Sequence, residues 1–336
     1  HQLAAVITQL APYGASKALD ATASLVAVTR PGVAPEDFYC STIYPTEVRV
    51  ADRWVRVRDQ RMDAAIVVDT AGDLPSAACV LMRDLQTGQQ VVCHETGVRV
   101  HLPDVRRNER EFRFMSAGAS SERRVEGTVE ELALEMRRIR ARAGRIVVVA
   151  GPVVVHTGGA PYLAELIREG FVQALLTGNA LPVHDIETNL FGTSLGVDLK
   201  RGVGVQGGHQ HHLKAINAIR RAGSIAAAVH DDVVTGGVMY ECVRAQVPYV
   251  LAGSIRDDGP LPETLMDLIE AQRQYAAAIA GADMILMLSS MLHAFGTGIM
   301  TPAGVRLVCV DISPAVVTKL ADRGSVESVG IVTDVG

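Results

Sequence analysis

The stretch IVVVAGPVVVHTGGAPYLAELIREG, residues 146–170, decides the fold class of this 336-residue chain. Its first residues, 146–149, are apolar without interruption, which is typical of a strand that is buried on both faces of a sheet. Two glycines, Gly158 and Gly159, then let the backbone approach a ligand closely, and a helix over residues 161–169 begins with a proline. Free N–H groups at such a helix start favour an anion, although a tight strand-to-helix turn explains the glycines equally well.

The alternation of strand and helix continues toward the end of the chain. Further buried strands are predicted near residues 174–177, 225–229, 249–252, 284–288 and 307–310. Helices are predicted near residues 183–191, 209–222, 237–245, 263–280 and 315–322. This order implies an α/β fold, in which a parallel sheet is covered by helices on both faces. Ligands of such sheets bind beyond the carboxyl ends of the strands, so functional residues are expected in the loops that follow them.

One more helix is predicted before the first of these strands. Thr128 and Glu131 form a capping box, in which each side chain accepts from the other residue's backbone N–H, and Gly144 closes the helix. We therefore expect a domain over residues 128–336, preceded by a charged linker over residues 111–127.

Residues 1–110 have a different pattern. Apolar and polar residues alternate in TEVRVADRWVRV (46–57), AAIVVD (64–69) and QQVVCHETGVRVHL (89–102). Such alternation predicts a smaller, mostly antiparallel β domain, with one helix at residues 3–10. The chain starts at His1 with neither a methionine nor a signal peptide, so we expect this α+β domain to be truncated at its start.

Composition excludes several function classes. The formal net charge of −5 gives no reason to expect nucleic acid or an anionic membrane as partner. No apolar run approaches the ~20 residues that span a bilayer. The five cysteines are scattered without a CxxC spacing, which favours a reducing cytoplasm over disulfides or a thiolate zinc site.

The stretch GGHQHHLKA, residues 207–215, places His209, His211 and His212 within four positions. His211 points away from the other two on a helix, and no cysteine or HExxH pattern accompanies them, so we expect no metal. The favoured interpretation is a helix start beside the ligand, with Gly207 and Gly208 freeing the backbone and one of the histidines offering a hydrogen bond.

Polar side chains also follow the next strands. TGNALPVHDIET (177–188) carries Asn179, His184, Asp185 and Glu187, although Asp185 also fits a first-turn helix charge. The loop SSMLHAFGTG (289–298) brings Ser289, Ser290 and Met291.

The loop AGSIRDDGPLPE (252–263) carries Ser254, Arg256, Asp257 and Asp258. Arginine beside two acids suits an amino-acid substrate, with the guanidinium on its carboxylate and the acids on its amines. A self-neutralising surface turn is the competing interpretation.

The stretch VDISP (310–314) places Asp311 directly after a strand. This is a usual position for a carboxylate that holds ribose hydroxyls. An acid near the start of the following helix explains it as well.

Longer motifs carry a resemblance. VVVAGPVVVHTGGAPYLAELIREG, GNALPVHDIETNLFGTSLGVDL, VLAGSIRDDGPLPE and VCVDISPAVVTKLADRGSVESVGIVTDVG resemble the LOR/SDH domain family, named after lysine-oxoglutarate reductase and saccharopine dehydrogenase. That family includes archaeal-type, NAD-dependent ornithine cyclodeaminases and the cyclodeaminase half of some bifunctional arginine-degrading enzymes. The resemblance covers the chain from about Pro35 onward, including EDFYCSTIYPTEVRV and SSERRV in the first domain.

The resemblance implies an NAD-binding domain similar to the deoxyhypusine-synthase and sirtuin type, behind a smaller mostly β domain. The pyrophosphate would then face residues 156–160, which include Thr157 and Ala160. Asn179 would lie near the nicotinamide, and Ser289, Ser290 and Asp311 near the adenosine. Met291, Ser254, Gly208, His209, His184 and Asp185 complete the expected cofactor-binding set.

The implied reaction converts L-ornithine to L-proline and ammonia with NAD bound throughout. Arg256 is expected to hold the substrate carboxylate, and Asp257 or Asp258 to take a proton from an amine. His184, Asp185 and Glu187 are the alternative bases. The resemblance also implies a cytoplasmic homo-oligomer with a small-molecule substrate. An amino-acid dehydrogenase of the saccharopine type and a non-catalytic NAD-binding module remain alternative functions.

Overall fold

The computed structural model describes residues 21–62, 64–81, 84–101, 121–199, 201–205, 208, 211–257, 260–322 and 328–335. The chain divides into two compact units, His1–Arg107 with Ile299–Ala303, and Asn108–Gly298 with Gly304–Gly336. The helix expected at residues 3–10 and most of the expected linker, residues 111–120, lie outside the described residues.

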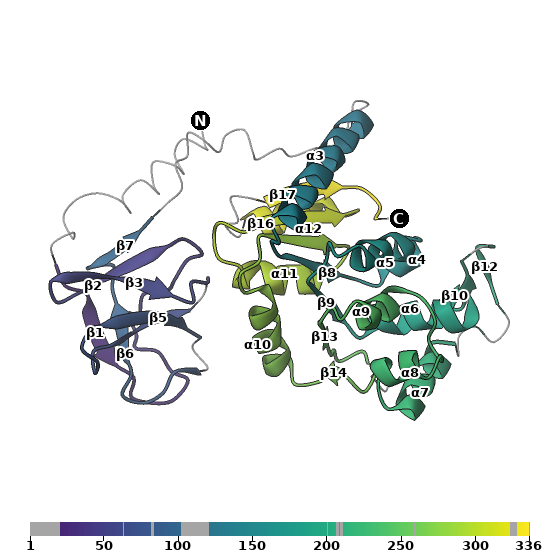
Figure 1. The fold of residues 1–336 in the computed structure, drawn as a ribbon. Helices are drawn as coiled ribbons and strands as arrows, with labels where there is room; N and C mark the ends of the chain where they lie inside the picture. Colours follow the sequence, from purple (N-terminus) through teal and green to yellow (C-terminus); the bar gives the residue numbers. More distant parts are fainter. Residues whose placement is uncertain are drawn as a thin grey trace. The chain divides into compact units, whose positions relative to one another are not determined.

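The first unit is built on one seven-stranded sheet with the order β1-β6-β4-β5-β3-β2-β7 (Figure 1). All neighbouring strands pair antiparallel except β3 and β5, so the predicted mostly antiparallel domain is confirmed. The strands are β1 (Ser24–Ala27), β2 (Thr46–Val50), β3 (Arg53–Arg58), β4 (Ala65–Asp69), β5 (Ser76–Val80), β6 (Gln90–Cys93) and β7 (Val98–Val100). Alternate residues such as Val48, Val50 and Val57 fill its core, as the period of two requires.

The second unit holds an all-parallel, seven-stranded sheet with the order β14-β13-β9-β8-β15-β16-β17 (Figure 1). Its strands are β8 (Ile146–Ala150), β9 (Ala174–Gly178), β13 (Tyr249–Ala252), β14 (Thr264–Leu265), β15 (Met284–Leu288), β16 (Arg306–Asp311) and β17 (Ser328–Val332). From β8 the chain adds strands first on one side and then, from β15, on the other. The switch point of the sheet therefore lies between β8 and β15.

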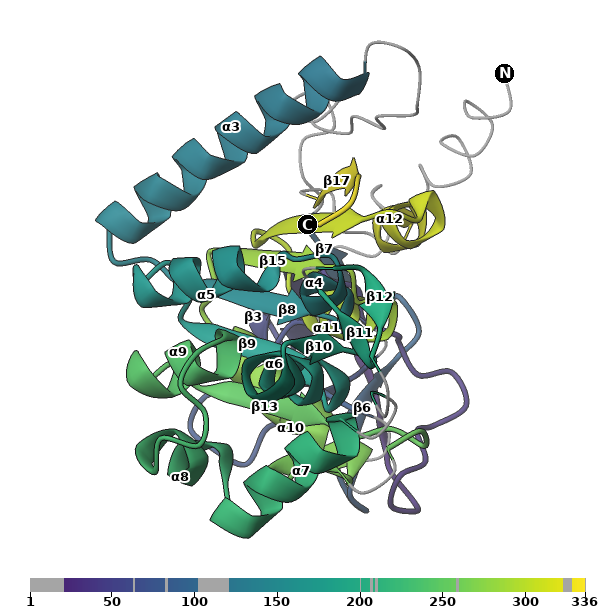
Figure 2. The same ribbon diagram turned by 90° about the vertical axis from the view of Figure 1, so that its right-hand side faces the viewer.

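Helices cover this sheet. Helix α5 packs against α9, and α6 packs against α4, α7 and α9. Helix α10 packs on β9 and β13, and α12 packs on β16 and β17 (Figures 1 and 2). The helices are α3 (Ser121–Ala141), α4 (Val153–His156), α5 (Ala160–Arg168), α6 (Ala180–Phe191), α7 (His211–Ala222), α8 (Ile225–His230), α9 (Val238–Arg244), α10 (Leu268–Ile279), α11 (Met291–Met300) and α12 (Pro314–Asp322). A small antiparallel sheet of β10 (Thr193–Ser194), β11 (Val197–Asp198) and β12 (Val203–Gly204) lies between α6 and α7 in the chain.

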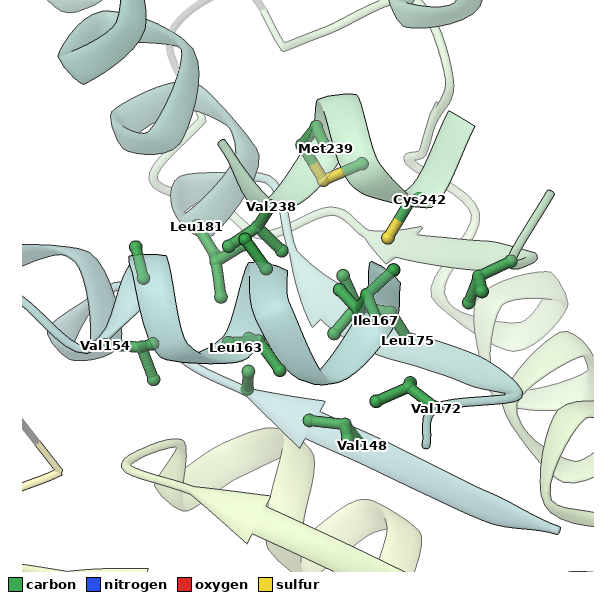
Figure 3. Close-up of a cluster of buried hydrophobic side chains, with 14 of the residues drawn as sticks. Val148, Val154, Leu163, Ile167, Val172, Leu175, Leu181, Val238, Met239 and Cys242 are labelled. Atoms are coloured by element: carbon green, nitrogen blue, oxygen red, sulfur yellow. The ribbon is translucent and has the colours of Figure 1, made fainter. Parts of the chain in front are cut away.

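The core of the second unit explains why it folds as it does. Figure 3 shows Val148, Leu163, Ile167, Leu175 and Met239 in one cluster. Together these five residues come from two strands and two helices. Each is at most 2% exposed. Full burial of such a side chain contributes about 1.5–3 kcal/mol, so this apolar layer fixes the helices on the sheet and places the strand ends.

Four expectations are wrong. The helix expected near residues 263–280 begins only at Leu268, because residues 264–265 pair with β13 as strand β14. Residues 225–229 form helix α8 rather than a strand, because the Ser224 hydroxyl accepts the Ala227 N–H and caps a run of alanines. Helix α3 begins at Ser121, so the capping box at Thr128 lies inside it. The expected loop at residues 289–298 is largely helix α11. The other predicted strands of the parallel sheet are confirmed within a residue or two.

Candidate functional site at the carboxyl edge of the parallel sheet

The loops after β8 and β15 meet at the switch point. Gly151 N–H donates to Leu288 O at 2.9 Å, and a Cβ on Gly151 would stand 2.1 Å from Ser289 O. Ser289 itself has φ of 44°, which is unusual for a residue other than glycine. The close approach of the two backbones therefore requires glycine at 151 and brings this residue next to Ser289 and Ser290.

Helix α5, which follows the short helix α4 after β8, begins without a side-chain cap. Gly159 occupies the N-cap position of α5, and Ala160 and Pro161 follow as its first residues. Gly158 has φ of +87°, and a Cβ placed there would meet nothing within 4 Å. Open space beside Gly158 and an uncapped helix start together suit a bound anion.

The helix after β9 begins in the same way. Asn179 is the N-cap residue of α6, but its side chain does not cap the helix. Its Oδ1 instead accepts from Leu261 N–H at 3.0 Å and from the Thr264 hydroxyl at 2.8 Å. Asn179 thus ties the residues that lead into β14 to the end of β9.

Glu187 lies at the centre of a buried polar cluster. Its side chain is 0% exposed, and Oε2 accepts from His184 Nδ1 at 2.8 Å and from Leu195 N–H at 3.2 Å. Oε1 accepts from the Thr193 hydroxyl at 2.9 Å and from Gly196 N–H at 3.0 Å. Burial raises the pKa of Glu187, but the hydrogen bonds outweigh it and the pKa is lowered.

Two further histidines adjoin this cluster. The His156 ring packs edge-on against His184 with centroids 4.8 Å apart, and its Nδ1 lies 2.7 Å from Ser194 Oγ. Burial and the neighbouring His184 lower the pKa of His156 to about 4, so its imidazole is neutral at pH 7. His211 Nδ1 lies 2.8 Å from Thr193 Oγ1.

Of the predicted histidine cluster, His211 is the first residue of α7, and its ring stacks on Phe191 at 4.7 Å. His209 lies outside the described residues. Gly208 lies so close to Gly196 that a Cβ on Gly208 would stand 2.5 Å from the carbonyl oxygen of Gly196. Within the described part of the chain, no group of three or more His, Cys, Asp and Glu is placed to hold a metal ion.

Asp185 accepts hydrogen bonds from the start of helix α9 rather than from the cluster around Glu187. Its Oδ1 and Oδ2 accept the Val238 and Met239 N–H groups at 2.9 Å each, at the start of α9. Gly237 has φ of +102°, and a Cβ there would stand 2.7 Å from the Asp185 carboxylate. Burial raises the pKa of Asp185 to about 6. Both oxygens are engaged with α9, which favours a structural role over contact with a ligand.

The loop after β13 is exposed at its tip. Asp257 Oδ2 accepts Ser254 N–H at 2.7 Å, and Ser254 Oγ accepts Arg256 N–H at 3.1 Å. Arg256 is exposed, Ser254 and Asp257 are half-buried, and Asp258 lies outside the described residues. Asp257 is therefore folded back on the backbone of its own loop, while Arg256 is exposed.

The loops after β15 and β16 complete the edge. Ser290 is buried, and its hydroxyl lies 2.8 Å from Nδ1 of His293 on α11. Asp311 ends β16, and its Oδ1 accepts Ser313 N–H at 2.8 Å. The exposed Met291 begins α11. His293 was not among the predicted residues, and the spacing of Ser290 and His293 on a helix was the signal that could have found it.

The predicted residues thus separate into groups. Asn179 directly follows β9, and Ser289 and Ser290 directly follow β15, whereas Gly158 and Gly159 lie beyond α4, where α5 begins. Asp311 ends the neighbouring strand β16, and His184 with Glu187 lies one turn into α6. The fold and the edge of its parallel sheet together define a Rossmann-type α/β protein, a class whose ligands bind beyond the carboxyl ends of the strands.

The chain belongs to the family described as arginine dihydrolase ArgZ-like, C-terminal. The Rossmann-fold model of that family matches residues 130–336, and the model of its first region matches residues 45–129. The predicted α/β domain with a parallel sheet, behind a smaller mostly β domain, is therefore confirmed. In the described residues no helix is long and apolar enough to cross a membrane.

Two curated relatives show how far the similarity extends. The chain is 62% identical over 317 residues to a bifunctional arginine dihydrolase/ornithine cyclodeaminase, AgrE, from Nostoc, covering 94% of this chain and 45% of the relative. It is 51% identical over 310 residues to an ornithine cyclodeaminase from Methanocaldococcus jannaschii, covering 90% and 73%. The chain thus spans about half the length of the bifunctional relatives.

Two solved structures are similar as well. A conserved putative LOR/SDH protein from Methanococcus maripaludis matches with a TM-score of 0.86 and 40% identity, over 96% of this chain and 95% of the other. The ternary complex of AgrE with ornithine and NAD+ matches with a TM-score of 0.63 and 59% identity, over 94% and 44%. The resemblance to the LOR/SDH family is confirmed.

Proposed function

We propose that the chain is an NAD-dependent ornithine cyclodeaminase that converts L-ornithine to L-proline and ammonia. The observation that carries the proposal is identity of 51–62% to relatives named ornithine cyclodeaminase, over at least 90% of the chain. The ternary complex with ornithine and NAD+ formed by AgrE supports the same ligands for this chain.

The carboxyl edge fits a nicotinamide dinucleotide. The uncapped start of α5 and the open side of Gly158 suit the pyrophosphate, because backbone N–H groups there lack side-chain partners. Thr157 and Ala160 flank this turn. Asp311 ends β16, and a carboxylate after a strand is a usual partner of ribose hydroxyls, which supports this role for Asp311. NAD+, when bound, supplies a hydride acceptor that later returns the hydride to the substrate carbon.

The substrate would lie against the loop after β13 and the start of α11. The exposed guanidinium of Arg256 can pair with the α-carboxylate, since arginine binds carboxylates through two parallel hydrogen bonds. Asp257 lies one residue further on and offers a negative charge to an ammonium group. The role of Asp258 stays a prediction from the sequence.

The reaction balances without net oxidation. The ornithine cation loses ammonium and becomes proline, and the hydride that leaves Cα returns to the same carbon after the δ-amine has bonded to it. The protein must therefore hold the carboxylate, remove a proton from an amine and exclude water while the imine exists. His184 and Glu187 are already bonded to each other and are suited to fixing the shape of this edge.

The test is an assay of the purified chain with NAD+ and L-ornithine, in which proline, ammonia and NADH are measured together. We expect proline and ammonia in equal amounts, with NAD+ far below the substrate concentration and no accumulation of NADH. Accumulation of NADH would instead indicate an amino-acid dehydrogenase. Binding of NAD+ without turnover of any basic amino acid would indicate a non-catalytic module.

Assembly and location remain predictions. We infer a homo-oligomer from the family resemblance and a cytoplasmic location from the scattered cysteines. Light scattering of the purified chain measures its mass, and a monomer at all concentrations would contradict the first of these inferences.

A further inference from the structure

His293 joins the ends of two strands, β15 and β9. It is the third residue of α11, which follows β15, and its half-buried ring reaches the end of β9. A Cβ on Gly178, the last residue of β9, would stand 2.8 Å from His293 Cε1 and 3.0 Å from Nε2. Glycine at position 178 therefore makes room for the imidazole.

The ring is held by neighbours from separate elements. Nδ1 bonds Ser290 Oγ at 2.8 Å, and the ring lies beside Tyr275 of α10 with centroids 6.2 Å apart. The Tyr275 hydroxyl donates to Thr177 O at 2.7 Å, so this aromatic support is itself fixed on β9. One ring nitrogen is thus occupied, and Nε2 has no hydrogen-bond partner among the residues that the structure describes.

Electrostatics favour the neutral ring. Burial lowers the pKa of His293, and the negative charge of Asp257 on the loop after β13 opposes this shift without cancelling it. The neutral imidazole has one N–H and one basic nitrogen. If Nδ1–H donates to Ser290 Oγ, the basic lone pair is on Nε2, which lies over Gly178.

Three acids near this edge are less available, because their oxygens already accept hydrogen bonds. Each Glu187 oxygen accepts two hydrogen bonds, and both Asp185 oxygens accept amides of α9. Asp257 Oδ2 accepts the Ser254 N–H. An occupied lone pair accepts a proton less readily, because the bond that it makes must first be broken.

We propose that His293 Nε2 accepts the proton that frees a substrate amine, and that Ser290 positions the ring for this transfer. The inference rests on the proposed cyclodeaminase function. In the step, an N–H bond of the bound ammonium breaks and a bond from Nε2 to hydrogen forms. The nitrogen keeps the electron pair and the imidazole becomes imidazolium. The proton returns to the departing ammonia, which leaves as ammonium.

The first experiment compares kcat and KM of the whole chain for wild type, His293→Asn and Ser290→Ala. We expect His293→Asn to lower kcat by about 100-fold or more, as loss of a general base does, with NAD+ affinity within about threefold of wild type. Ser290→Ala is expected to lower kcat less. The matched control is His230→Asn, an exposed histidine at the end of α8, which leaves turnover unchanged.

A second variant separates chemistry from packing. His293→Gly with added imidazole is expected to regain part of kcat in proportion to the free base, whereas a merely structural histidine would show no such rescue. Nitrogen NMR of the wild-type chain without ligands supplies a readout besides activity. The inference requires a neutral His293 ring at pH 7 with the proton on Nδ1.

The outcomes distinguish the two proposals. A wild-type chain that makes no proline overturns the proposed function and, with it, the role of His293. A wild-type chain that makes proline, with His293→Asn equally active or with the NMR proton on Nε2, overturns only the inference.

Discussion

Asp185 and Glu187 lie two residues apart on α6, yet their surroundings shift the pKa values of the two carboxyl groups in opposite directions. Asp185 is 3% exposed and its pKa is raised to about 6, whereas Glu187 is 0% exposed and its pKa is lowered. Asp185 faces two amides of α9, while Glu187 faces a histidine, a hydroxyl and two amides.

Burial alone therefore does not set the charge of an acid. Two amide hydrogen bonds do not offset the desolvation of Asp185, but four donors, one of them an imidazole, do so for Glu187. Because residues two apart on a helix face different directions, α6 can hold the fold together through one acid and shape the sheet edge through the other.

The comparison predicts its largest effect at Glu187. Glu187→Leu leaves the His184 ring, the Thr193 hydroxyl and two amides without their acceptor, and we expect a loss of about 3–5 kcal/mol in unfolding free energy. Glu187→Gln keeps the shape and part of the bonding, so it should cost less. Denaturant unfolding measures the stability of both variants. Equal stability of Glu187→Leu and wild type would show that the hydrogen bonds to Glu187 do not stabilise the fold.

The next effect is expected at Asp185. Asp185→Ala leaves the Val238 and Met239 amides buried without acceptors, which costs about 2–3 kcal/mol. Hydrogen exchange should become faster in α9 and remain unchanged in β10. Faster exchange in β10 instead would show that Asp185 and Glu187 support one region rather than two.

The pH dependence of stability should differ in sign between the two acids. The folded pKa of Asp185 is raised from 3.8 to about 6, so its contribution is present below about pH 4 and is lost as the pH rises through 6. For Glu187 the folded pKa is lowered from 4.5, so its contribution is present above that pH and is lost on acidification.

Asp185→Asn isolates the first of these contributions. Between pH 4 and pH 7 we expect wild type to lose roughly 2–3 kcal/mol more stability than the variant does, since one pKa unit corresponds to ~1.4 kcal/mol. Thermal unfolding at both pH values measures the difference. Parallel curves for the two proteins would show that Asp185 has an ordinary pKa.

The smallest effect is expected at Thr193. Thr193→Val keeps the shape but removes the hydroxyl that joins Glu187 to His211, which should cost about 1 kcal/mol. The pKa of Glu187 should rise, because one of its donors is lost. Carboxyl NMR titration measures this shift, and an unchanged pKa would mean that His184 and the amides alone hold the charge.

Much of the second unit could be predicted from the sequence. Uninterrupted apolar runs such as residues 146–149 and 284–288 identified buried parallel strands, and the glycines after β8 marked the sheet edge. The strand predicted at residues 225–229 was wrong because a short apolar run fits a strand and a buried helix equally well. The helix start at Ser121 was missed because charged Glu and Arg residues, which favour helices, were interpreted as a linker.

The candidate site was less predictable. The sequence identified Glu187 as a site residue, but its partners Thr193, Leu195 and Gly196 belong to a small sheet that no periodicity reveals. His293 was missed because the glycines around it suggested a loop, although the segment is helical. Spacing along the chain shows neighbours on one element, whereas the contact of His293 with Gly178 joins two distant elements.

The central claim is that the carboxyl edge around the β8–β15 switch point binds a nicotinamide dinucleotide beside a small diamino acid. The most direct measurement is a crystal structure of the chain with NAD+ and L-ornithine bound. We predict the pyrophosphate at the Gly158–Gly159 turn and an ornithine amine within hydrogen-bond distance of His293. A dinucleotide bound away from this edge would contradict the account.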